Sequence, residues 1–396
     1  MEILYVSTLC SKKVVDDLYR KTNSNPGFAA QKFNRLVAEG FVKNGQSVTT
    51  LSAVPALKGF TDNFFLLFPK ERCGDVTYRY LPYCSNSIIR RLLTFGCSFW
   101  QTIRWGLRCR SNKVIIYDVL HISVCVGSLL ASKILGIKSC GIVTDMPGLM
   151  VSQRKKDSAK KEIVSNFNRW YLPFFNFYVF LTKAMNSVIN RNNRPYIVME
   201  GVVDIEQGLK AYASPVSRGK SVVYAGGLYE EYGVKSMAEA FLRIKDKSVY
   251  LDLFGSGPLT DWLRMLSKSH PQIRYHGVVA NDVIVEFEQK ALLLINPRPT
   301  TEEFTRYSFP SKNMEYMLSG TAMLTTDLPG MPEEYHPYVL KIEDETPDGY
   351  VKALNESLEL GESQLCSIGE KARNWIVTNK NNVIQTNRII KMLFNK

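Results

Sequence analysis

The chain has 396 residues, of which 45% are hydrophobic, 11% aromatic and 22% charged. This usage is typical of a globular protein of about two to three domains, and it excludes a disordered, collagen-like or coiled-coil chain. The formal net charge of +13 lies in the first half, because residues 1–204 hold 28 Lys and Arg against 13 Asp and Glu, whereas residues 205–396 hold 22 against 24. We therefore expect the first half to meet an anionic partner such as phospholipid headgroups or nucleic acid.

The eight cysteines are scattered singly, and no two of them have Cys-x-x-Cys spacing. This distribution argues against a disulfide framework or a zinc site. The chain starts with the strand-like run Met1–Ser7, without a basic segment followed by a long apolar one, so no signal peptide is predicted. The apolar stretch 115–143 is interrupted by charged residues, and no segment reads as a membrane-spanning helix. We expect a cytoplasmic protein.

Short strand-like runs alternate with helical stretches along the chain, an order that predicts parallel βαβ units. In the first half the expected strands are 3–6, 47–51, 114–117, 140–143 and 179–181, and the clearest helices are 29–43 and 124–135. The second half restarts the pattern with strands 222–224, 250–254, 292–295 and 322–325 and helices 234–244, 282–288 and 311–318.

The pattern breaks at residues 205–220, which are polar, carry no apolar period and are expected to form a linker. We thus predict an α/β protein with two Rossmann-like domains facing each other across a cleft. The first domain would span residues 1–204 and the second residues 221–375. A C-terminal helical segment, 376–396, is expected to cross back to the first domain.

The strongest local pattern is a strand, 292–295, followed by a polar loop and the helix 311–318. Ser308 is a candidate N-cap residue, and Pro310 is favourable in the first turn. Gly320 is favourable at the C-terminal end, where a residue with left-handed backbone conformation usually ends a helix. The amides at the start of such a helix face out of the carboxyl end of a parallel sheet, where α/β proteins bind phosphorylated ligands. Lys312 opposes the helix dipole in that first turn, so an anionic ligand would explain its presence.

Glu315 follows Lys312 by three residues and shares its helical face. A carboxylate just behind a phosphate site can accept hydrogen bonds from the vicinal hydroxyls of a ribose. The alternative is a solvent-exposed Lys-Glu pair worth a few tenths of a kcal/mol. The two residues alone leave both readings open.

Five segments between residues 224 and 320 resemble, in order and spacing, the C-terminal domain of GT-B glycosyltransferases, specifically retaining family 4. The segments are Tyr224–Leu228 with Gly233-Val234, Phe254–Gly257, Gly277-Val278, Ala291–Pro297 and Ser308–Gly320. The resemblance implies a site for a nucleotide-sugar, with Glu315 as the second carboxylate of a Glu-x7-Glu motif that holds the ribose. It also implies that the glycine-rich turns, Gly226-Gly227 and Gly255-Ser256-Gly257, approach the nucleotide.

The chain departs from the family pattern at two places. The first carboxylate of the motif would fall at Tyr307, so Glu302 or Glu303 is expected to replace it. The usual basic pair after the Gly-Gly turn is missing, and Lys312, with Arg298 or Arg306, would supply the charge for the diphosphate. The predicted donor-binding set is Glu315, Gly226, Gly227, Gly255, Gly257, Arg298, Glu302, Tyr307, Ser308, Ser311 and Gly27.

The first half resembles the acceptor domain of the same family, with less specific motifs. Gly27 precedes the first long helix, where glycine lets the backbone approach a donor phosphate, although an ordinary loop glycine explains it nearly as well. Asp145, in the segment Thr144–Gly148, follows a strand end and could orient or deprotonate an acceptor hydroxyl, or merely cap a loop. His121 is expected to be a packed or loop histidine.

Basic and aromatic residues interleave at helical spacing over residues 87–110, as in a helix that lies in an anionic membrane interface. The residues expected to face the membrane are Arg90, Arg91, Trp100, Arg104, Trp105 and Arg108. A second basic stretch, Arg154–Lys161, precedes the aromatic run 170–177. Core packing of the apolar face is the competing interpretation, and no nucleic-acid signature is present.

The predicted function is a retaining glycosyltransferase of the hexosyltransferase type. It would move a sugar from a nucleoside diphosphate sugar to a hydroxyl of a lipid-linked or other glycan acceptor at the cytoplasmic membrane face. Lys312, Glu303 and Asp145 are the predicted catalytic residues. No Asp-x-Asp motif is present, so neither a metal nor another cofactor is expected. The alternatives are a non-catalytic nucleotide-binding subunit of a glycosylation complex and a GT-B nucleotide-sugar epimerase.

Overall fold

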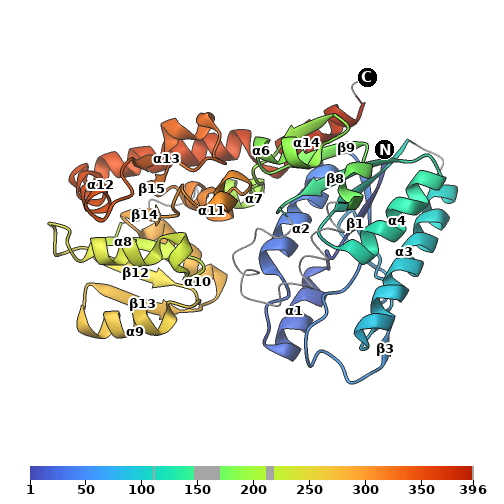
Figure 1. Cartoon of the computed structure of the whole chain (residues 1–396), viewed down its shortest axis with the longest axis horizontal. Coiled ribbons are helices and arrows are strands. Elements are labelled where there is room, and N and C mark those ends of the chain that lie inside the picture. Colours follow the sequence, from blue (N-terminus) through green and yellow to red (C-terminus); the bar gives the residue numbers. More distant parts are fainter. Residues whose placement is uncertain (110–111, 147–169, 211–217, 395–396) are drawn as a thin grey trace. The chain divides into compact units, whose positions relative to one another are not determined.

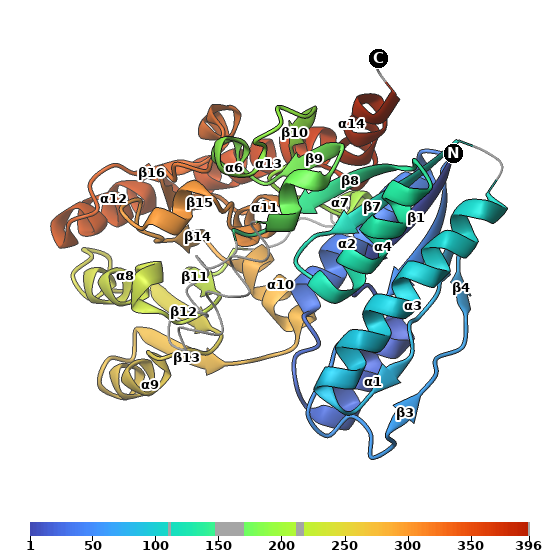
Figure 2. The ribbon, with the colours of Figure 1, turned by 45° about the vertical axis from the view of Figure 1, so that its right-hand side comes forward.

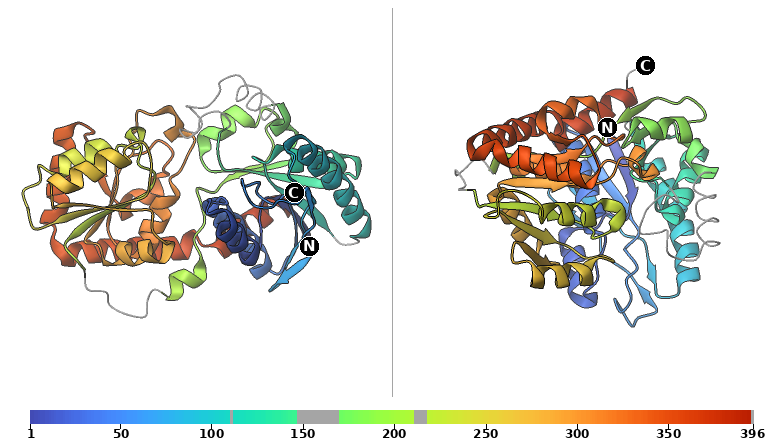
Figure 3. Two further views of the ribbon diagram at one scale, coloured as in Figure 1. Left: turned by 90° about the horizontal axis from the view of Figure 1, so that it is seen from below. Right: turned by 60° about the vertical axis from the view of Figure 1, so that its left-hand side comes forward.

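A computed structural model describes residues 1–109, 112–146, 170–210 and 218–394. The chain divides into unit 1, Met1–Val202 with Asn382–Lys396, and unit 2, Val203–Asn381. Each unit holds one large sheet of mainly parallel strands with helices on both faces (Figures 1 and 3). The predicted α/β class with two Rossmann-like domains is confirmed.

The large sheet of unit 1 has the strand order β10-β9-β8-β7-β1-β2-β5-β4, and only the β4–β5 pair in it is antiparallel. Because helices cover both faces, its central strands are apolar almost throughout, as in Val114–Tyr117 of β7. The strands are β1 (Glu2–Ser7), β2 (Ser47–Ser52), β4 (Glu71–Cys73), β5 (Val76–Tyr78), β7 (Lys113–Asp118), β8 (Lys138–Val143), β9 (Phe177–Phe180) and β10 (Tyr196–Val198). Two short strands, β3 (Phe65–Leu66) and β6 (Tyr83–Cys84), pair separately.

One apolar core of unit 1 joins strand residues such as Ile3 and Ile116 to helices α1, α2 and α14. Helix α3 packs along α4 (Figure 2). The helices are α1 (Lys12–Thr22), α2 (Phe28–Lys43), α3 (Ser87–Arg108), α4 (Ile122–Ile134), α6 (Lys183–Ile189) and α14 (Asn382–Phe394), with a 3-10 turn at Leu172–Phe174.

Unit 2 holds six parallel strands in the order β13-β12-β11-β14-β15-β16. Counted along this unit, the order is 3-2-1-4-5-6, that of dinucleotide-binding folds, and it reverses between β11 and β14. The strands are β11 (Ser221–Ala225), β12 (Tyr250–Phe254), β13 (Ile273–Gly277), β14 (Leu293–Asn296), β15 (Met323–Thr326) and β16 (Leu340–Ile342). Ligands of such sheets bind outside the carboxyl ends of the strands at the reversal point.

Two apolar cores lie in unit 2, one containing side chains from α8, α9 and α12 and the other side chains from α11 and α13. The helices are α7 (Ile205–Lys210), α8 (Val234–Phe241), α9 (Thr260–Ser269), α10 (Asn281–Lys290), α11 (Ser311–Ser319), α12 (Pro347–Glu359) and α13 (Gly361–Asn379). Among its described residues the unit also has 3-10 turns at Glu230–Tyr232, Glu303–Arg306 and Glu333–Tyr338.

The unit boundaries differ in detail from the predicted ones. The chain leaves unit 1 after Val202 and returns to it at Asn382. The segment expected to be a linker begins with helix α7, and residues 211–217 lie outside the described residues. The returning helix α14 packs on α2, where Asn44 Nδ2 donates to Thr386 Oγ1 at 2.9 Å.

Candidate functional site

Helix α11 starts where the polar loop after β14 ends, but its first turn differs from the predicted one. Pro310, not Ser308, is the N-cap residue, and the helix begins at Ser311. A residue before proline avoids the helical region, so Phe309 stays extended and cannot belong to the first turn. The Ser308 hydroxyl is buried without a hydrogen-bond partner among the described residues. Gly320 ends the helix in the left-handed region with a φ of 75°, as predicted.

The amino end of α11 offers amide groups for a ligand. Pro310 has no side-chain oxygen that could cap the first turn, and Ser311 is exposed. Asn313 is fully buried beside the end of β14, where its Oδ1 accepts a hydrogen bond from Asn296 Nδ2 at 2.6 Å. Its own Nδ2 has no partner within the described part of the chain. The helix thus meets the reversal edge of the sheet with backbone and side-chain donors.

Lys312 lies between two carboxylates. Its Nζ is 2.9 Å from Glu315 Oε2 and 3.9 Å from Oε1 of Glu288, which is buried on α10. Burial favours the neutral amine, but the two carboxylates outweigh it and raise the pKa of Lys312 above its ordinary value. Lys312 therefore carries its charge at neutral pH. The side chains of Lys312 and Glu315 keep 30% and 27% of their surface exposed, so both are reachable from solvent.

The glycine-rich turns at the ends of β11 and β12 pack against each other. A Cβ at Gly255, whose φ is +122°, would overlap the carbonyl oxygen of Gly226, and one at Gly257 would overlap that of Leu228. The turns are also joined by hydrogen bonds from Gly226 N to Phe254 O and from Leu228 N to Ser256 O, both at 3.0 Å. Packing between the turns therefore explains Gly255 and Gly257 before any ligand is considered. Gly227 lies beside the Tyr229 and Tyr232 rings.

The loop after β14 holds three more of the predicted donor residues, Arg298, Glu302 and Tyr307. The Arg298 guanidinium lies 4.4 Å from the centre of the Tyr232 ring and 5.3 Å from that of Phe304, so aromatic rings fix its orientation. Glu302 is half-buried and precedes the 3-10 turn, in which Glu303 and Arg306 are exposed. Tyr307 follows the turn and is half-buried. These side chains lie in one loop, and their contacts do not favour Glu302 over Glu303.

Unit 1 holds a cavity of about 750 Å³ at the point where its strand order reverses, between β1 and β7. The walls come from the segments that follow β1, β2 and β7, from the starts of α2 and α4, and from β6 and α3. The lining residues are Thr8, Pro26, Gly27, Ala30, Ala53, Val54, Pro55, Ala56, Pro82, Tyr83, Arg90, Arg91, Thr94, Leu120, His121, Ile122, Ser123 and Val124. Its position is that of a ligand site in an open α/β sheet.

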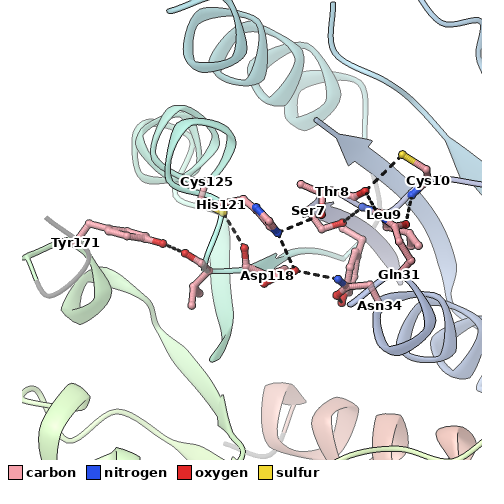
Figure 4. Close-up of polar contacts among 12 residues, drawn as sticks. Ser7, Thr8, Leu9, Cys10, Gln31, Asn34, Asp118, His121, Cys125 and Tyr171 are labelled. Carbon is pink, nitrogen blue, oxygen red and sulfur yellow. Dashed lines mark hydrogen bonds and ion pairs between the residues drawn. The ribbon is translucent and has the colours of Figure 1, made fainter. Parts of the chain in front are cut away.

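A polar network lies at this edge of the sheet (Figure 4). His121 Nε2 is 3.1 Å from Thr8 Oγ1 and 3.5 Å from Asp118 Oδ2. Asn34 Nδ2 donates to the same Asp118 oxygen at 2.9 Å. Burial opposes the charge of Asp118, but His121, Asn34 and the Leu120 backbone outweigh it and hold the pKa of Asp118 below its ordinary value. Asp118 is therefore a carboxylate, and it orients the His121 ring through Nε2.

Of the two predicted settings for His121, a packed or a loop histidine, the structure shows the second. His121 is the N-cap residue of α4, its side chain is 36% exposed, and it lines the cavity. Gly27, also in the wall, is the N-cap residue of α2 with a φ of +86°, and a Cβ there would meet nothing within 4 Å. Asp145 is half-buried two residues after β8, at the same edge of the sheet. The end of its segment, Pro147-Gly148, lies outside the described residues.

Helix α3 presents only part of the predicted membrane-facing set. Trp105 is 6% exposed and packs into unit 1, because its position falls on the side of α3 that contacts α4. Arg90 is half-buried, and its Nη1 donates to Cys84 O at 2.9 Å. Trp100, Arg104 and Arg108 are exposed and line, with Arg79 and Gln101, a second cavity of about 430 Å³.

Other apolar side chains are exposed on α3 and on the segment before β6. They are Phe64, Phe65, Leu67, Ile88, Leu92, Phe95 and Leu107. The second predicted basic stretch, Arg154–Lys161, lies outside the described residues. Within the described ranges no helix combines the length and the apolarity needed to cross a bilayer.

Three functional candidates escape the sequence reasoning. Glu288 reads as one more charged residue of an amphipathic helix, and only the packing of α10 on α11 brings it to Lys312. Asp118 and His121 did carry a signal, since Asp118 is the last residue of the buried strand β7 and His121 follows that strand by three residues. No group of three or more His, Cys, Asp or Glu side chains in the described part of the chain is arranged to hold a metal ion.

Comparison with protein families finds one match, and it lies within unit 2. Residues 219–359 match the family model described as "Glycosyl transferases group 1". The match includes both glycine-rich turns, the loop after β14 and helix α11. No curated protein sequence matches the chain.

Solved structures share the fold over the whole chain. HepE of Anabaena, in a complex with UDP, is 13% identical with a TM-score of 0.62, and 99% of each chain is covered. Sucrose-phosphate synthase of Thermosynechococcus elongatus is 11% identical with a TM-score of 0.66, and 100% of this chain and 99% of that chain are covered. The lipopolysaccharide outer core galactosyltransferase WaaB is 13% identical with a TM-score of 0.60, with 100% and 99% covered. The family match and the shared fold together support a GT-B glycosyltransferase.

Proposed function

We propose that the protein transfers a sugar from a nucleoside diphosphate sugar to a hydroxyl of a lipid-linked or other glycan acceptor, with retention of the anomeric configuration. The observation that carries the proposal is the family match over residues 219–359, which contains Lys312 and Glu315 at the start of α11. The reversal edge of the sheet, at which α11 begins, is where phosphorylated ligands bind in such folds.

The donor would bind to unit 2 through Lys312 and the first amides of α11. Breaking the bond between the anomeric carbon and the diphosphate places negative charge on the leaving group. A lysine kept charged by its neighbours, together with fixed amides, stabilises that charge without reorganisation. Glu315 would exchange its ion pair with Lys312 for the ribose hydroxyls. The proposal includes no metal or other cofactor.

The acceptor would bind to unit 1 in the cavity beside His121. Because the Asp118 carboxylate can only accept hydrogen bonds, the His121 nitrogen that faces it carries the proton. In the neutral ring, Nδ1 is then the acceptor, and it suits an incoming hydroxyl. Asp145 stays a candidate for the same task. Glu302 or Glu303 would bind the donor sugar in place of the missing first carboxylate of the motif.

The test is a panel of UDP- and GDP-sugars incubated with the purified chain and with membrane lipid extracts as acceptor source. UDP-glucose is the first donor to try, because HepE was crystallised in complex with it. Release of UDP or GDP that depends on the extract, together with a glycosylated product whose new linkage has the anomeric configuration of the donor, is the expected result. Stabilisation by nucleotide without product would favour a non-catalytic subunit, and a changed sugar without acceptor would favour an epimerase.

We also propose that the protein works at the cytoplasmic face of the membrane, bound through the exposed side of α3. The support is the combination there of Arg104 and Arg108 with exposed Trp100 and neighbouring apolar side chains. Cationic and aromatic side chains on one helix face suit the headgroup region of an anionic bilayer. Arg90 and Arg91 are not part of this surface, because they line the larger cavity.

Changing Arg104 and Arg108 together to Gln should weaken binding to anionic liposomes. Each cation near such a surface contributes about 1 kcal/mol, so the pair should cost about 30-fold in partitioning at moderate salt. Co-sedimentation with phosphatidylglycerol vesicles measures the effect. The matched control is Arg72→Gln with Arg191→Gln, two exposed arginines outside α3. Equal sedimentation of both double variants would end the membrane proposal.

A further inference from the structure

The larger cavity of unit 1 combines apolar walls with positive charge. Ala53, Val54 and Pro55 form part of the wall after β2, and Pro82 with Tyr83 continues it. Arg90 and Arg91 supply the positive charge, His121 also lines the space, and none of the described lining residues is acidic. The Asp118 carboxylate is buried beneath His121 and pairs with it. The walls therefore favour a ligand that is apolar on one side and anionic on another.

The two arginines differ in how they are held. Arg90 donates to Cys84 O at 2.9 Å and to Ser85 O at 3.3 Å, and its guanidinium lies 5.3 Å from the centre of the Tyr83 ring. Those contacts fix Arg90 at the wall. Arg91 is exposed and has no ion pair or side-chain hydrogen bond within the described ranges. Its guanidinium is therefore available to an anion that enters the cavity.

Two helices also begin at the cavity. His121 is the N-cap residue of α4, and no side chain caps that helix. Gly27 is the N-cap residue of α2, where Asn25 Oδ1 accepts hydrogen bonds from Gly27 N at 2.8 Å and Phe28 N at 2.9 Å, so the later amides of the first turn are the ones left for a ligand. Helix amino ends carry a partial positive charge and unsatisfied N–H groups. The helix ends and the arginines are independent features, and both favour an anion at the same place.

We propose that this cavity binds the acceptor through a phosphate or diphosphate that is joined to an apolar group, and not as a neutral glycan. The inference rests on the proposed function and names the substrate class of its acceptor side. The phosphate contacts Arg91 and the helix ends, while the apolar group lies along the wall after β2. His121 then faces the part of the acceptor that carries the reactive hydroxyl.

The experiment measures binding of octyl phosphate, octyl diphosphate, octyl glucoside and inorganic phosphate to the full chain by calorimetry, below the micelle concentration and without membranes. We expect saturable binding of the two octyl phosphates, at least tenfold tighter than octyl glucoside and inorganic phosphate. Arg91→Gln should weaken octyl diphosphate about tenfold or more, since a charge-assisted hydrogen bond is lost. The control Arg191→Gln changes an exposed arginine that precedes β10, at the opposite edge of the sheet, and should leave binding unchanged.

Three results would overturn the proposal. If octyl glucoside bound as tightly as the octyl phosphates, the cavity would not recognise the negative charge. If inorganic phosphate bound as tightly as they do, the cavity would not recognise the apolar group. Competition by UDP that is weakened in Arg91→Gln would show that the cavity takes the nucleotide. Glu315→Ala separates this inference from the proposed function. If this variant fails to bind nucleotide, octyl diphosphate should still bind to it. Thermal unfolding checks that each variant is folded.

Discussion

Changing Lys312 to Ala should lower kcat by about 100-fold or more, while the affinity for the donor falls much less. Fixed positive groups that meet charge developing in the transition state are worth about 3–4 kcal/mol. Lys312 is held charged between Glu315 and Glu288, so its removal also leaves two carboxylates beside the leaving diphosphate. Steady-state kinetics with the donor identified by the nucleotide-sugar panel separates kcat from KM.

The matched control is Lys290→Ala. Lys290 lies on α10 in the same unit, is mostly exposed, and pairs with Glu286 at 2.5 Å, outside the amino end of α11. It should change kcat by less than about twofold, because an exposed ion pair contributes little to stability. An unchanged kcat in folded Lys312→Ala would contradict the assignment of this charge to the leaving group.

Changing Glu315 to Ala should weaken uridine or guanosine diphosphate binding about 10- to 100-fold, the loss expected for hydrogen bonds to a charged acceptor. The change in nucleotide affinity has a second contribution, because the substitution removes the ion pair with Lys312 and frees that lysine for phosphate. Calorimetry with the nucleoside diphosphate, the nucleoside and inorganic pyrophosphate separates the loss of ribose contacts from the release of Lys312. The nucleoside should bind more weakly, whereas inorganic pyrophosphate should bind as well as before or better.

The control for this prediction is Glu286→Gln, which removes an exposed carboxylate of α10. It should leave all three affinities unchanged. Equal weakening of nucleoside and pyrophosphate in Glu315→Ala would point to a general disturbance of α11. Unchanged nucleoside affinity would remove the ribose role.

The two carboxylates beside Lys312 also affect how a diphosphate would bind. Two carboxylates around one ammonium give the start of α11 a net negative charge, opposite to what a diphosphate needs. Binding therefore requires Glu315 to turn from Lys312 to the ribose, which returns the ammonium to the phosphates. Ribose and diphosphate would then be recognised together, because each of these two contacts depends on the exchange.

The alternation of apolar runs and amphipathic helices was enough to predict the two α/β halves. Buried parallel strands need continuous apolar residues, as in Leu293–Ile295 of β14, and such a run can be recognised from neighbouring residues in the sequence. The helix around Lys312 and Glu315, and its end at Gly320, were predictable for the same reason: their spacing is a property of adjacent residues. The start of that helix was not, because Ser308 competes with the restriction that Pro310 places on Phe309.

Contacts between residues far apart in the chain were decided only by the tertiary structure. Glu288 reaches Lys312 across two helices, and Thr8 meets His121 across two neighbouring strands. Trp105 is buried because the packing of α3 on α4 determines which face of α3 is covered. The sequence of α3 does not specify that face, because aromatic residues lie on several sides of the helix. The sequence alone determined the elements and the short-range motifs, whose physics is local. The charge balance of the ligand sites depends on which side chains the fold brings within about 4 Å, and that distance is set by packing.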